Sequence, residues 1–287
     1  MKIIRTSEYI SLSQSHYTRS LIDKFSYSKF SSVSTPFDPS IQLLKNTRNP
    51  LNQEKYSQII GSLMYLSNRT RPDIAHVISR LSRYTVNPDQ THWNALDRVF
   101  RYLIGTINYC LRFSGYPSVL EGYSDANWVS DSLDIKSTSG YVFILRGGTI
   151  SWQSTKQTII ARSTMEAELI ALDSACSEAE WLKELLNQIP CVPTPIPPIL
   201  IHCDSKAAID FCKKKLVNTK INRHIKIRQK SIKRFEKQSV ISLQHVDTND
   251  NLADCLTKGL NRTKVLKCSC IMVRTKLLRG RYDLAYK

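Results

Sequence analysis

The sequence has little glycine and proline and no long apolar run. Its 287 residues include only 9 Gly and 11 Pro, too few for a collagen-like or low-complexity chain. No stretch approaches the ~18 apolar residues that predict a membrane-spanning helix, and residues 1–8 lack the apolar core of a secretory signal. We therefore expect a folded protein inside the cell, in the cytoplasm or the nucleus, neither secreted nor membrane-bound.

The cysteines lack the spacing of a metal site. Eight are present, but none forms a Cys-x-x-Cys pair and none stands at zinc-like spacing from a histidine. Without an export signal, they are expected to be reduced thiols, several of them small core residues. We expect neither a disulfide framework nor a structural zinc.

Positive charge is abundant and concentrated in one region. The formal net charge is +17, and residues 205–287 carry 21 basic and 6 acidic side chains. The densest stretch, residues 213–237, holds 11 basic residues and one acid. A focused basic region favours a polyanionic partner, most often nucleic acid. The alternative is a solvated helix face.

Hydrophobic periodicity divides the chain into a helical part and a mixed part. A helix is expected near residues 13–25, and three more across 54–105, the second opened by Pro72 and the third ending at Gly105. Strands are expected at 121–129, 140–145 and 149–154, with a Gly147-Gly148 turn between the last two. The expected elements that follow are a helix over 164–188, a Pro-rich connector, a strand over 199–203, helices over 205–214 and 225–235, a strand over 240–246 and a helix over 250–256.

This order predicts an α/β fold, with a mixed five-stranded sheet flanked by helices. Residues beyond 262 show no pattern and are expected to form a basic tail.

Acidic residues occur where such a fold would gather them. Asp125 lies inside the first predicted strand, Asp204 ends a short apolar strand, and Asp254 lies in the last short helix. Glu166 and Glu168 begin the long helix. Converging carboxylates repel one another unless a divalent cation relieves the repulsion, and Mg²⁺ prefers such oxygen ligands. Taken singly, each acid also fits a structural role, such as a helix cap or a charged residue on an edge strand.

Helical geometry favours Glu168 over Glu166 as the site residue. At about 100° per residue, Glu168 lies about 60° from the centre of the apolar stripe of its helix, and Glu166 about 100° away on the other side. Residues two apart on a helix do not face the same site. We therefore expect Glu168 at the buried edge and Glu166 toward solvent.

Several sequence runs resemble a known family. They are Tyr-Ser-Asp-Ala-Asn-Trp (123–128), Ser-Thr-Ser-Gly-Tyr-Val-Phe (137–143), Ile-Ser-Trp-Gln-Ser-Thr-Lys-Gln (150–157), Ser-Thr-Met-Glu-Ala-Glu-Leu (163–169), Cys-Asp-Ser-Lys-Ala-Ala-Ile (203–209) and Leu-Ala-Asp-Cys-Leu-Thr-Lys (252–258). Together they resemble the ribonuclease H domain of copia-type LTR retrotransposon polyproteins. The runs at 60–66, 70–75 and 101–106 resemble the end of the reverse transcriptase of the same polyproteins.

The resemblance implies a ribonuclease H fold and Mg²⁺-dependent hydrolysis of the RNA strand of an RNA/DNA hybrid, with two ions and with Mn²⁺ as a substitute. The acidic positions of the family, both catalytic and metal-binding, fall on Asp125, Glu168, Asp204 and Asp254. His245 is similarly placed to a mobile histidine that assists proton transfer or product departure, although a surface histidine at a strand end is an equal alternative.

A basic protrusion in some ribonucleases H is similar to the segment 213–237. Ten residues are expected to contact phosphates of the hybrid: Lys213, Lys214, Lys215, Lys220, Arg223, Lys226, Arg228, Lys230, Lys233 and Arg234. Each neutralised phosphate steepens the log–log salt dependence of binding by about 0.9. Trp128 and Trp152 either stack on the duplex or belong to the core.

The resemblance also implies a division of the chain. We expect residues 1–115 to be the end of a reverse transcriptase, thumb- or connection-like, residues 116–262 a ribonuclease H-like domain, and residues 263–287 a basic tail. The chain has no adjacent Asp pair, which a polymerase site requires, so no polymerase activity is expected. Lys230 stands where the family has a second histidine, and the ending differs, which indicates a truncated or domesticated copy.

Three functions remain open at this point. The first is a hybrid-specific endoribonuclease, with the remaining reverse-transcriptase segments or a dimer partner as further partners. The second is a non-catalytic nucleic-acid-binding module that grips its ligand through the basic face. The third is an inactive transposon relic, whose helical part exposes an apolar face.

Overall fold

The computed structural model describes residues 1–114, 119–131, 135–214 and 222–273. The chain forms two compact units, which are described separately below. The first unit comprises Met1–Pro117, Arg146–Thr149 and Gly259–Lys287, and the second comprises Ser118–Leu145 and Ile150–Lys258. The functional division expected at residues 115 and 262 stays a prediction. In the part of the chain that the structure describes, no helix is long and apolar enough to cross a membrane.

The first unit combines helices with a small antiparallel sheet of order β1-β2-β3. Its strands are β1 (Lys2–Arg5), β2 (Tyr9–Ser13) and β3 (Cys110–Ser114). Its helical elements are α1 (Ser15–Lys24), α2 (Gln53–Thr70), η1 (Pro72–Ile74), α3 (Ala75–Leu81), η2 (Ser82–Tyr84), α4 (Gln90–Gly105) and α8 (Arg262–Met272). The expected helices are confirmed. The three strands were not predicted, and the expectation of a patternless tail is wrong for 262–272, because the buried Val265, Cys268 and Met272 give α8 an inward face.

A buried ion pair organises the end of α2. The Arg71 side chain is 1% exposed, and its Nε and Nη2 donate to the two Asp73 carboxylate oxygens at 2.9 and 2.8 Å. Arg71 also donates to the Thr106 carbonyl and hydroxyl, and Tyr102 donates to Asp73 at 2.9 Å. Pro72 follows, as is favoured at a first helical turn. The paired geometry compensates for removing both charges from water.

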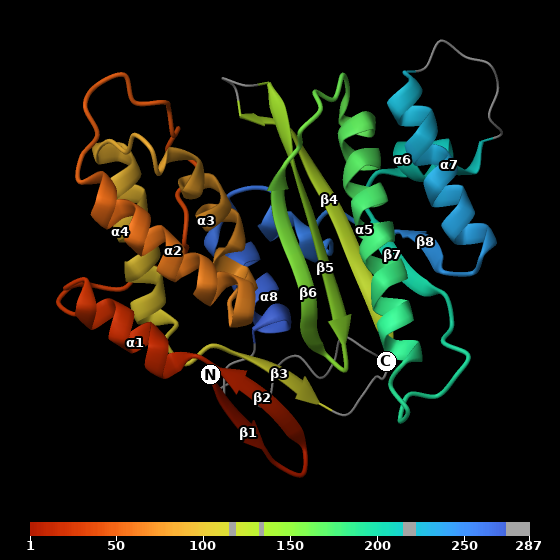
Figure 1. The fold of residues 1–287 in the computed structure, drawn as a ribbon, viewed down its shortest axis with the longest axis horizontal. Coiled ribbons are helices and arrows are strands. Elements are labelled where there is room, and N and C mark those ends of the chain that lie inside the picture. Colours follow the sequence, from red (N-terminus) through yellow and green to blue (C-terminus); the bar gives the residue numbers. More distant parts are fainter. Residues whose placement is uncertain (115–118, 132–134, 215–221, 274–287) are drawn as a thin grey trace. The chain divides into compact units, whose positions relative to one another are not determined.

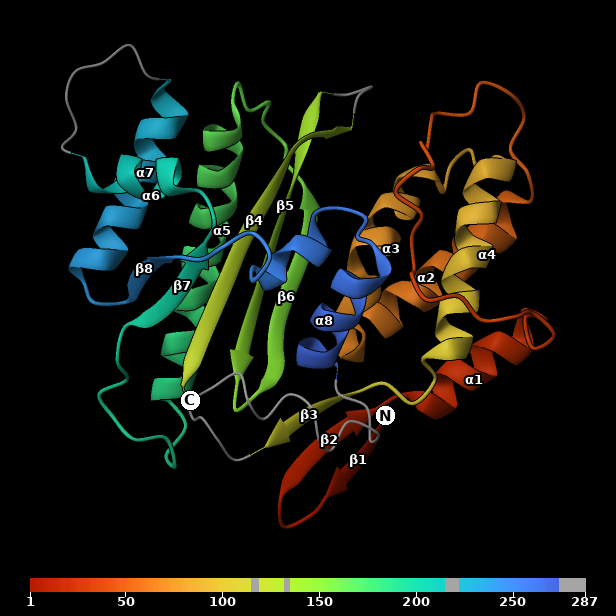
Figure 2. The ribbon, with the colours of Figure 1, turned by 180° about the vertical axis from the view of Figure 1, so that it is seen from behind.

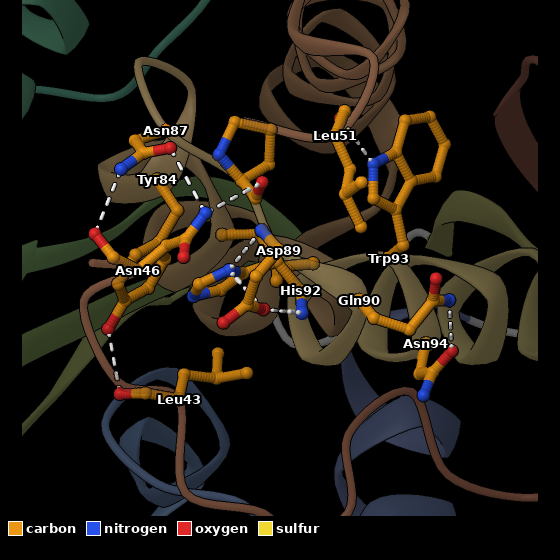
Figure 3. A network of polar contacts seen from close by, with 12 residues as sticks. Leu43, Asn46, Leu51, Tyr84, Asn87, Asp89, Gln90, His92, Trp93 and Asn94 are labelled. Atoms are coloured by element: carbon orange, nitrogen blue, oxygen red, sulfur yellow. Dashed lines mark hydrogen bonds and ion pairs between the residues drawn. The ribbon is translucent and has the colours of Figure 1, made fainter. Parts of the chain in front are cut away.

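The start of α4 is fixed by a capping box (Figure 3). The Asp89 carboxylate accepts from the His92 backbone N–H at 3.0 Å, and His92 Nδ1 accepts from the Asp89 N–H at 3.0 Å. Trp93 Nε1 donates to the Leu51 carbonyl at 2.8 Å, and Asn87 donates to the Asn46 carbonyl at 2.8 Å. These bonds tie the loop before α2 to the helix start, and a cap of this kind stabilises a helix by about 1 kcal/mol.

The second unit contains a five-stranded sheet of order β6-β5-β4-β7-β8 (Figures 1 and 2). Its strands are β4 (Leu120–Asp131), β5 (Lys136–Leu145), β6 (Gly148–Lys156), β7 (Ile199–Cys203) and β8 (Ile241–His245). Its helices are α5 (Thr164–Asn187), α6 (Lys206–Lys213), α7 (Arg223–Lys237) and η3 (Leu252–Leu256). Because β4 is antiparallel to β5 but parallel to β7, the predicted mixed five-stranded sheet is confirmed.

The hairpin turn between β5 and β6 lies one residue earlier than predicted. Its two residues are Arg146 and Gly147, both with positive φ, of 54° and 70°. Two consecutive residues in the left-handed region of φ/ψ space form a turn whose backbone twist matches that of the two flanking strands. The predicted second turn residue, Gly148, already belongs to β6.

The main core lies between the sheet and α5, which crosses one sheet face (Figure 1). Alternation along β5 assigns the faces. Tyr141 and Phe143 belong to this core, so Gly140 and Val142 point to the opposite face, where η3 packs on β4 and β5. Cys176 and Cys212 lie in the core, as expected for small apolar residues. The sheet is thus covered by α5 on one side and approached by η3 on the other.

Candidate active site

Four carboxylates from separate elements of the second unit meet at one edge of the sheet. Asp125 lies in β4, Glu168 in the second turn of α5, Asp204 directly after β7 and Asp254 in η3. Oxygen atoms of Asp125, Asp204 and Asp254 all lie within 4.8 Å of one another. Glu168 and Asp204 form a second group at the same spacing with the Cys203 thiol. The four predicted acids are therefore neighbours in space, with Asp204 common to both groups.

Local structure explains this convergence. β4 and β7 are parallel, with Ser124 opposite Cys203, so Asp125 and Asp204 follow at the same sheet edge. Asn251 fixes η3 to β4: its Nδ2 donates to the Ser124 carbonyl at 2.9 Å, and its Oδ1 accepts from the Ala253 N–H. These bonds place Asp254 beside Asp125 although 129 positions separate them along the chain.

The N-terminal part of α5 supplies Glu168, the fourth acid. Ser163 caps the helix by accepting from the Glu166 N–H at 3.2 Å. Glu168 is buried, whereas Glu166 is partly exposed and its side chain accepts from the Arg162 N–H at 2.9 Å. The structure therefore brings Glu168, and not Glu166, into the carboxylate cluster, in the sense that the helical geometry predicts.

Burial and mutual repulsion disfavour the charged form of these acids. Burial raises the pKa of Asp125 to about 6; Lys258 and the Thr257 hydroxyl oppose the rise, and the charges of Asp254 and Asp204 add to it. Burial, with Asp125 and Asp204 nearby, raises the pKa of Glu168 well above its usual range. Glu168 Oε2 is buried without a hydrogen-bond partner. The site thus holds acceptor capacity that the described protein groups leave unused.

The donor set fits hard divalent cations. A buried carboxylate oxygen without a partner is costly, and a coordinated cation would satisfy it. Carboxylate-rich sites suit Mg²⁺ and Mn²⁺, whereas the adjacent Cys203 thiol is a soft donor that these ions do not favour. The residues that could hold such ions are the four acids, Asp125, Glu168, Asp204 and Asp254.

Two neighbours of the acids were missed by sequence reasoning. Lys258 Nζ lies 2.6 Å from Asp254 Oδ1, and the fully buried Thr257 hydroxyl donates to Asp125 Oδ2. Burial disfavours the charge on Lys258, but the surrounding Asp125, Asp254 and Asp204 outweigh that effect and raise its pKa. The signal was present in the sequence, because Lys258 follows Asp254 by four residues and such pairs meet on a helical turn.

His245 lies next to the carboxylate cluster, but it is not among the residues whose side-chain ligand atoms lie within 4.8 Å of one another. It ends β8 opposite Cys203, is exposed, and its Nε2 is 3.2 Å from the backbone carbonyl of Asp204. The imidazole therefore has solvent on one side and the sheet edge that carries Asp204 on the other.

The predicted basic residues occupy different environments. Lys215 and Lys220 lie outside the described residues. The exposed ones are Lys213, Lys214, Arg223, Lys230 and Arg234, and the half-buried ones are Lys226, Arg228 and Lys233.

Some of these basic side chains already have protein partners. Arg228 Nε is 3.6 Å from Asp173, Arg234 is 3.8 Å from Glu180, and Lys233 donates to the Lys214 carbonyl. Among the tryptophans, Trp128 is 43% exposed and donates to the Ala161 carbonyl at 3.1 Å, while Trp152 is half-buried.

Two known polyproteins are similar to this chain over most of its length. No family model matches the chain. It is 37% identical over 277 residues to the retrovirus-related Pol polyprotein from transposon TNT 1-94 of Nicotiana tabacum, covering 93% of this chain and 21% of that protein. It is 36% identical over 261 residues to the polyprotein from transposon RE2 of Arabidopsis thaliana, covering 90% and 18%. The chain thus spans about a fifth of these relatives.

Among solved structures, the chain is similar to LC11-RNase H1 in complex with an RNA/DNA hybrid, at 17% identity and a TM-score of 0.37, covering 48% of this chain and 93% of that one. The mixed five-stranded sheet flanked by helices, which the family resemblance implies, is present in the second unit. Both polyprotein matches extend over about nine-tenths of the chain, which is therefore similar to one segment of the Pol polyproteins of plant copia-type transposons.

Proposed function

We propose that the second unit is a metal-dependent endoribonuclease that cleaves the RNA strand of RNA/DNA hybrids. The observation that carries the proposal is the meeting of Asp125, Glu168, Asp204 and Asp254, delivered by four separate elements to one sheet edge. The four carboxyl groups repel one another, and the buried Glu168 Oε2 has no hydrogen-bond partner. Both features lower the stability of the fold. A catalytic role explains why the fold retains them.

Each part of the site has a chemical task in this proposal. The four acids would hold divalent ions, and the chemistry that such ions would supply is activation of a water molecule and stabilisation of the leaving oxygen of a phosphodiester. Asp125 and Glu168, held rigidly by β4 and α5, fix the geometry of that site. His245, exposed beside the Asp204 carbonyl, accepts or delivers a proton at the solvent side.

The basic residues of α6 and α7 would position the substrate. Exposed Lys213, Lys214, Arg223 and Lys230 are free of the ion pairs described for Arg228 and Arg234, so they are the ones we assign to phosphate contacts. Such contacts hold the duplex without reading its sequence. Selection of the RNA strand then depends on its 2′-hydroxyl groups near the carboxylates.

The test compares two glutamates on one helix turn. The purified full chain is incubated with a labelled RNA/DNA hybrid, with Mg²⁺ or with EDTA. We expect Mg²⁺-dependent cutting of the RNA strand, lost in Asp125→Asn and in Glu168→Gln, and retained within about twofold in Glu166→Gln, which changes the same chemistry two residues away.

The other outcomes separate the remaining functions. Salt-sensitive binding of the hybrid without cutting would replace the proposal by a nucleic-acid-binding module. Neither binding nor cutting would indicate a relic. Equal loss in Glu166→Gln and Glu168→Gln would contradict the assignment of the site, because only Glu168 lies in the carboxylate cluster.

A further inference from the structure

A basic side chain, that of Lys258, contacts the carboxylate cluster. Lys258 Nζ is 2.6 Å from Asp254 Oδ1; the Asp254 side chain is 3% exposed and that of Lys258 is 34% exposed. The contact is direct, and it joins Asp254 in η3 to a residue two positions beyond the end of η3. It is therefore a charge-assisted bond at the mouth of the site, with the lysine on the solvent side.

The Lys258 ammonium lies near more than one acid of the cluster. Its ammonium is 2.6 Å from Asp254 Oδ1, and carboxylate oxygens of Asp254, Asp125 and Asp204 lie within 4.8 Å of one another. One ammonium therefore compensates part of the negative charge of these carboxyl groups. In a carboxylate site of this kind the same compensation is the role of a divalent cation.

We infer that Lys258 is a tethered cation that competes with a divalent ion for Asp254, so that the ion at this position enters together with the substrate phosphate. The inference rests on the proposed nuclease function and defines its order of binding. Lys258 is a positioning residue in this scheme: it occupies Asp254 until a phosphodiester offers its ammonium another anionic partner.

The competition follows from distance. An ion that coordinates Asp254 lies about 2.0–2.6 Å from its oxygen, so it would approach an ammonium already 2.6 Å from that oxygen. Even at the dielectric constant of water, a divalent ion and an ammonium about 4 Å apart repel enough to change affinity by roughly tenfold or more. The flexible four-carbon stem of lysine allows the ammonium to leave when a phosphate attracts it.

The test measures Mn²⁺ binding to the full chain without nucleic acid, by titration calorimetry and by the electron paramagnetic resonance signal of free Mn²⁺. We expect Lys258→Met and Lys258→Gln to bind Mn²⁺ at the Asp254 position about tenfold more tightly than the unmodified protein. Lys258→Arg keeps the charge and should stay near the unmodified protein. Lys237→Met, which removes an exposed lysine at the end of α7, serves as the matched control.

Two results would overturn the inference. If the two neutral variants bind Mn²⁺ as the unmodified protein does, Lys258 does not compete. If they bind it more weakly, Lys258 supports the ion instead. Circular dichroism verifies that each variant is folded, and the glutamine variant, which can still donate to Asp254, serves if the methionine variant is not.

The same measurement separates this inference from the proposed function. If neither the unmodified protein nor any variant binds Mn²⁺ and no hybrid is cut, the metal-dependent nuclease itself fails. If the unmodified protein binds Mn²⁺ and cuts, but the neutral variants show the same affinity, only the role of Lys258 fails.

Discussion

Gly140 lies directly opposite Asp125 in the antiparallel ladder of β4 and β5. A Cβ atom at Gly140 would lie 2.8 Å from both Leu256 Cβ and Thr257 Cγ2, and 3.3 Å from the Ala253 carbonyl oxygen. The missing side chain therefore admits η3 against the sheet. Because Asp254 belongs to η3 and Thr257 directly follows it, the glycine allows both residues to reach Asp125.

The first prediction follows from this contact. Gly140→Ala should shift η3 away from β4 and disturb the Asp125–Asp254 spacing. We expect loss of hybrid cleavage by at least tenfold, with destabilisation of roughly 1–3 kcal/mol as for other overpacked sites. Cleavage assays and denaturant unfolding measure the two effects.

A second glycine provides the control. Gly61 lies within α2, and a Cβ atom there meets nothing within 4 Å. Gly61→Ala should leave cleavage unchanged and stabilise the protein by about 0.5–1 kcal/mol, because glycine is a poor helix former. Normal cleavage by Gly140→Ala would contradict the role assigned to that close approach.

The second prediction concerns pH. Burial raises the pKa of Asp125 from 3.8 to about 6 and also raises that of Glu168. The metal-free folded protein therefore binds more protons than the unfolded chain above about pH 4, so these acids make its stability fall as pH rises through about 6.

The variant Asp125→Asn removes one of these acids while leaving an oxygen to accept from Thr257. In EDTA, we expect it to be more stable than the unmodified protein at pH 7, by roughly 1–3 kcal/mol, and to lose this advantage near pH 4. Thermal melts at both pH values measure the difference. A stability difference that does not change with pH would be inconsistent with the raised pKa.

The third prediction concerns the buried ion pair of the first unit. Arg71→Met would leave the Asp73 carboxylate buried without its two guanidinium bonds. We expect a loss of roughly 3–5 kcal/mol in denaturant unfolding, as when one partner of a buried pair is removed. Arg98→Met is the control: its pair with Asp38 is 3.2 Å long but only partly buried, with side chains 28% and 32% exposed, so the cost should be within about 1 kcal/mol. Equal costs would contradict the difference in burial.

The fourth prediction separates phosphate contacts from structural pairs on α7. Lys230 is exposed, whereas Arg228 is half-buried and lies 3.6 Å from Asp173 on α5. Lys230→Ala should reduce the log–log salt slope of hybrid binding by about 1. Arg228→Ala should leave that slope nearly unchanged and lower the stability of the second unit. Binding titrations from low to high salt, with melting curves, test both, and a reversed pattern would exchange the two roles.

Local patterns in the sequence predicted most of the second unit. The strand at 199–203 is β7 with the same bounds, and the Ser205 cap of the following helix is present, accepting from the Ala208 N–H. These features depend on periodicity and capping, which involve residues a few positions apart. The same reasoning placed Glu168 at the buried edge of α5, because one helix turn relates it to the apolar stripe.

Long-range relationships were not available from such patterns. The strands β2 and β3 pair residues about a hundred positions apart, as between Leu12 and Leu111. Helix α8 lies in a stretch with weak amphipathic periodicity, and its inward face becomes visible only once its neighbours bury it. Likewise, only packing determines that Arg228 pairs with Asp173 while Lys230 remains exposed.

The sequence by itself determined the helices and strands of the second unit, their order, and which four acids stand where a mixed sheet gathers them, because these follow from local periodicity and topology. Only the tertiary structure decided how close the acids lie, that Gly140 admits η3, and that Lys258 contacts Asp254 among them. Those relationships depend on side chains brought together from distant positions, and their energies come from burial and charge, which the linear order does not encode.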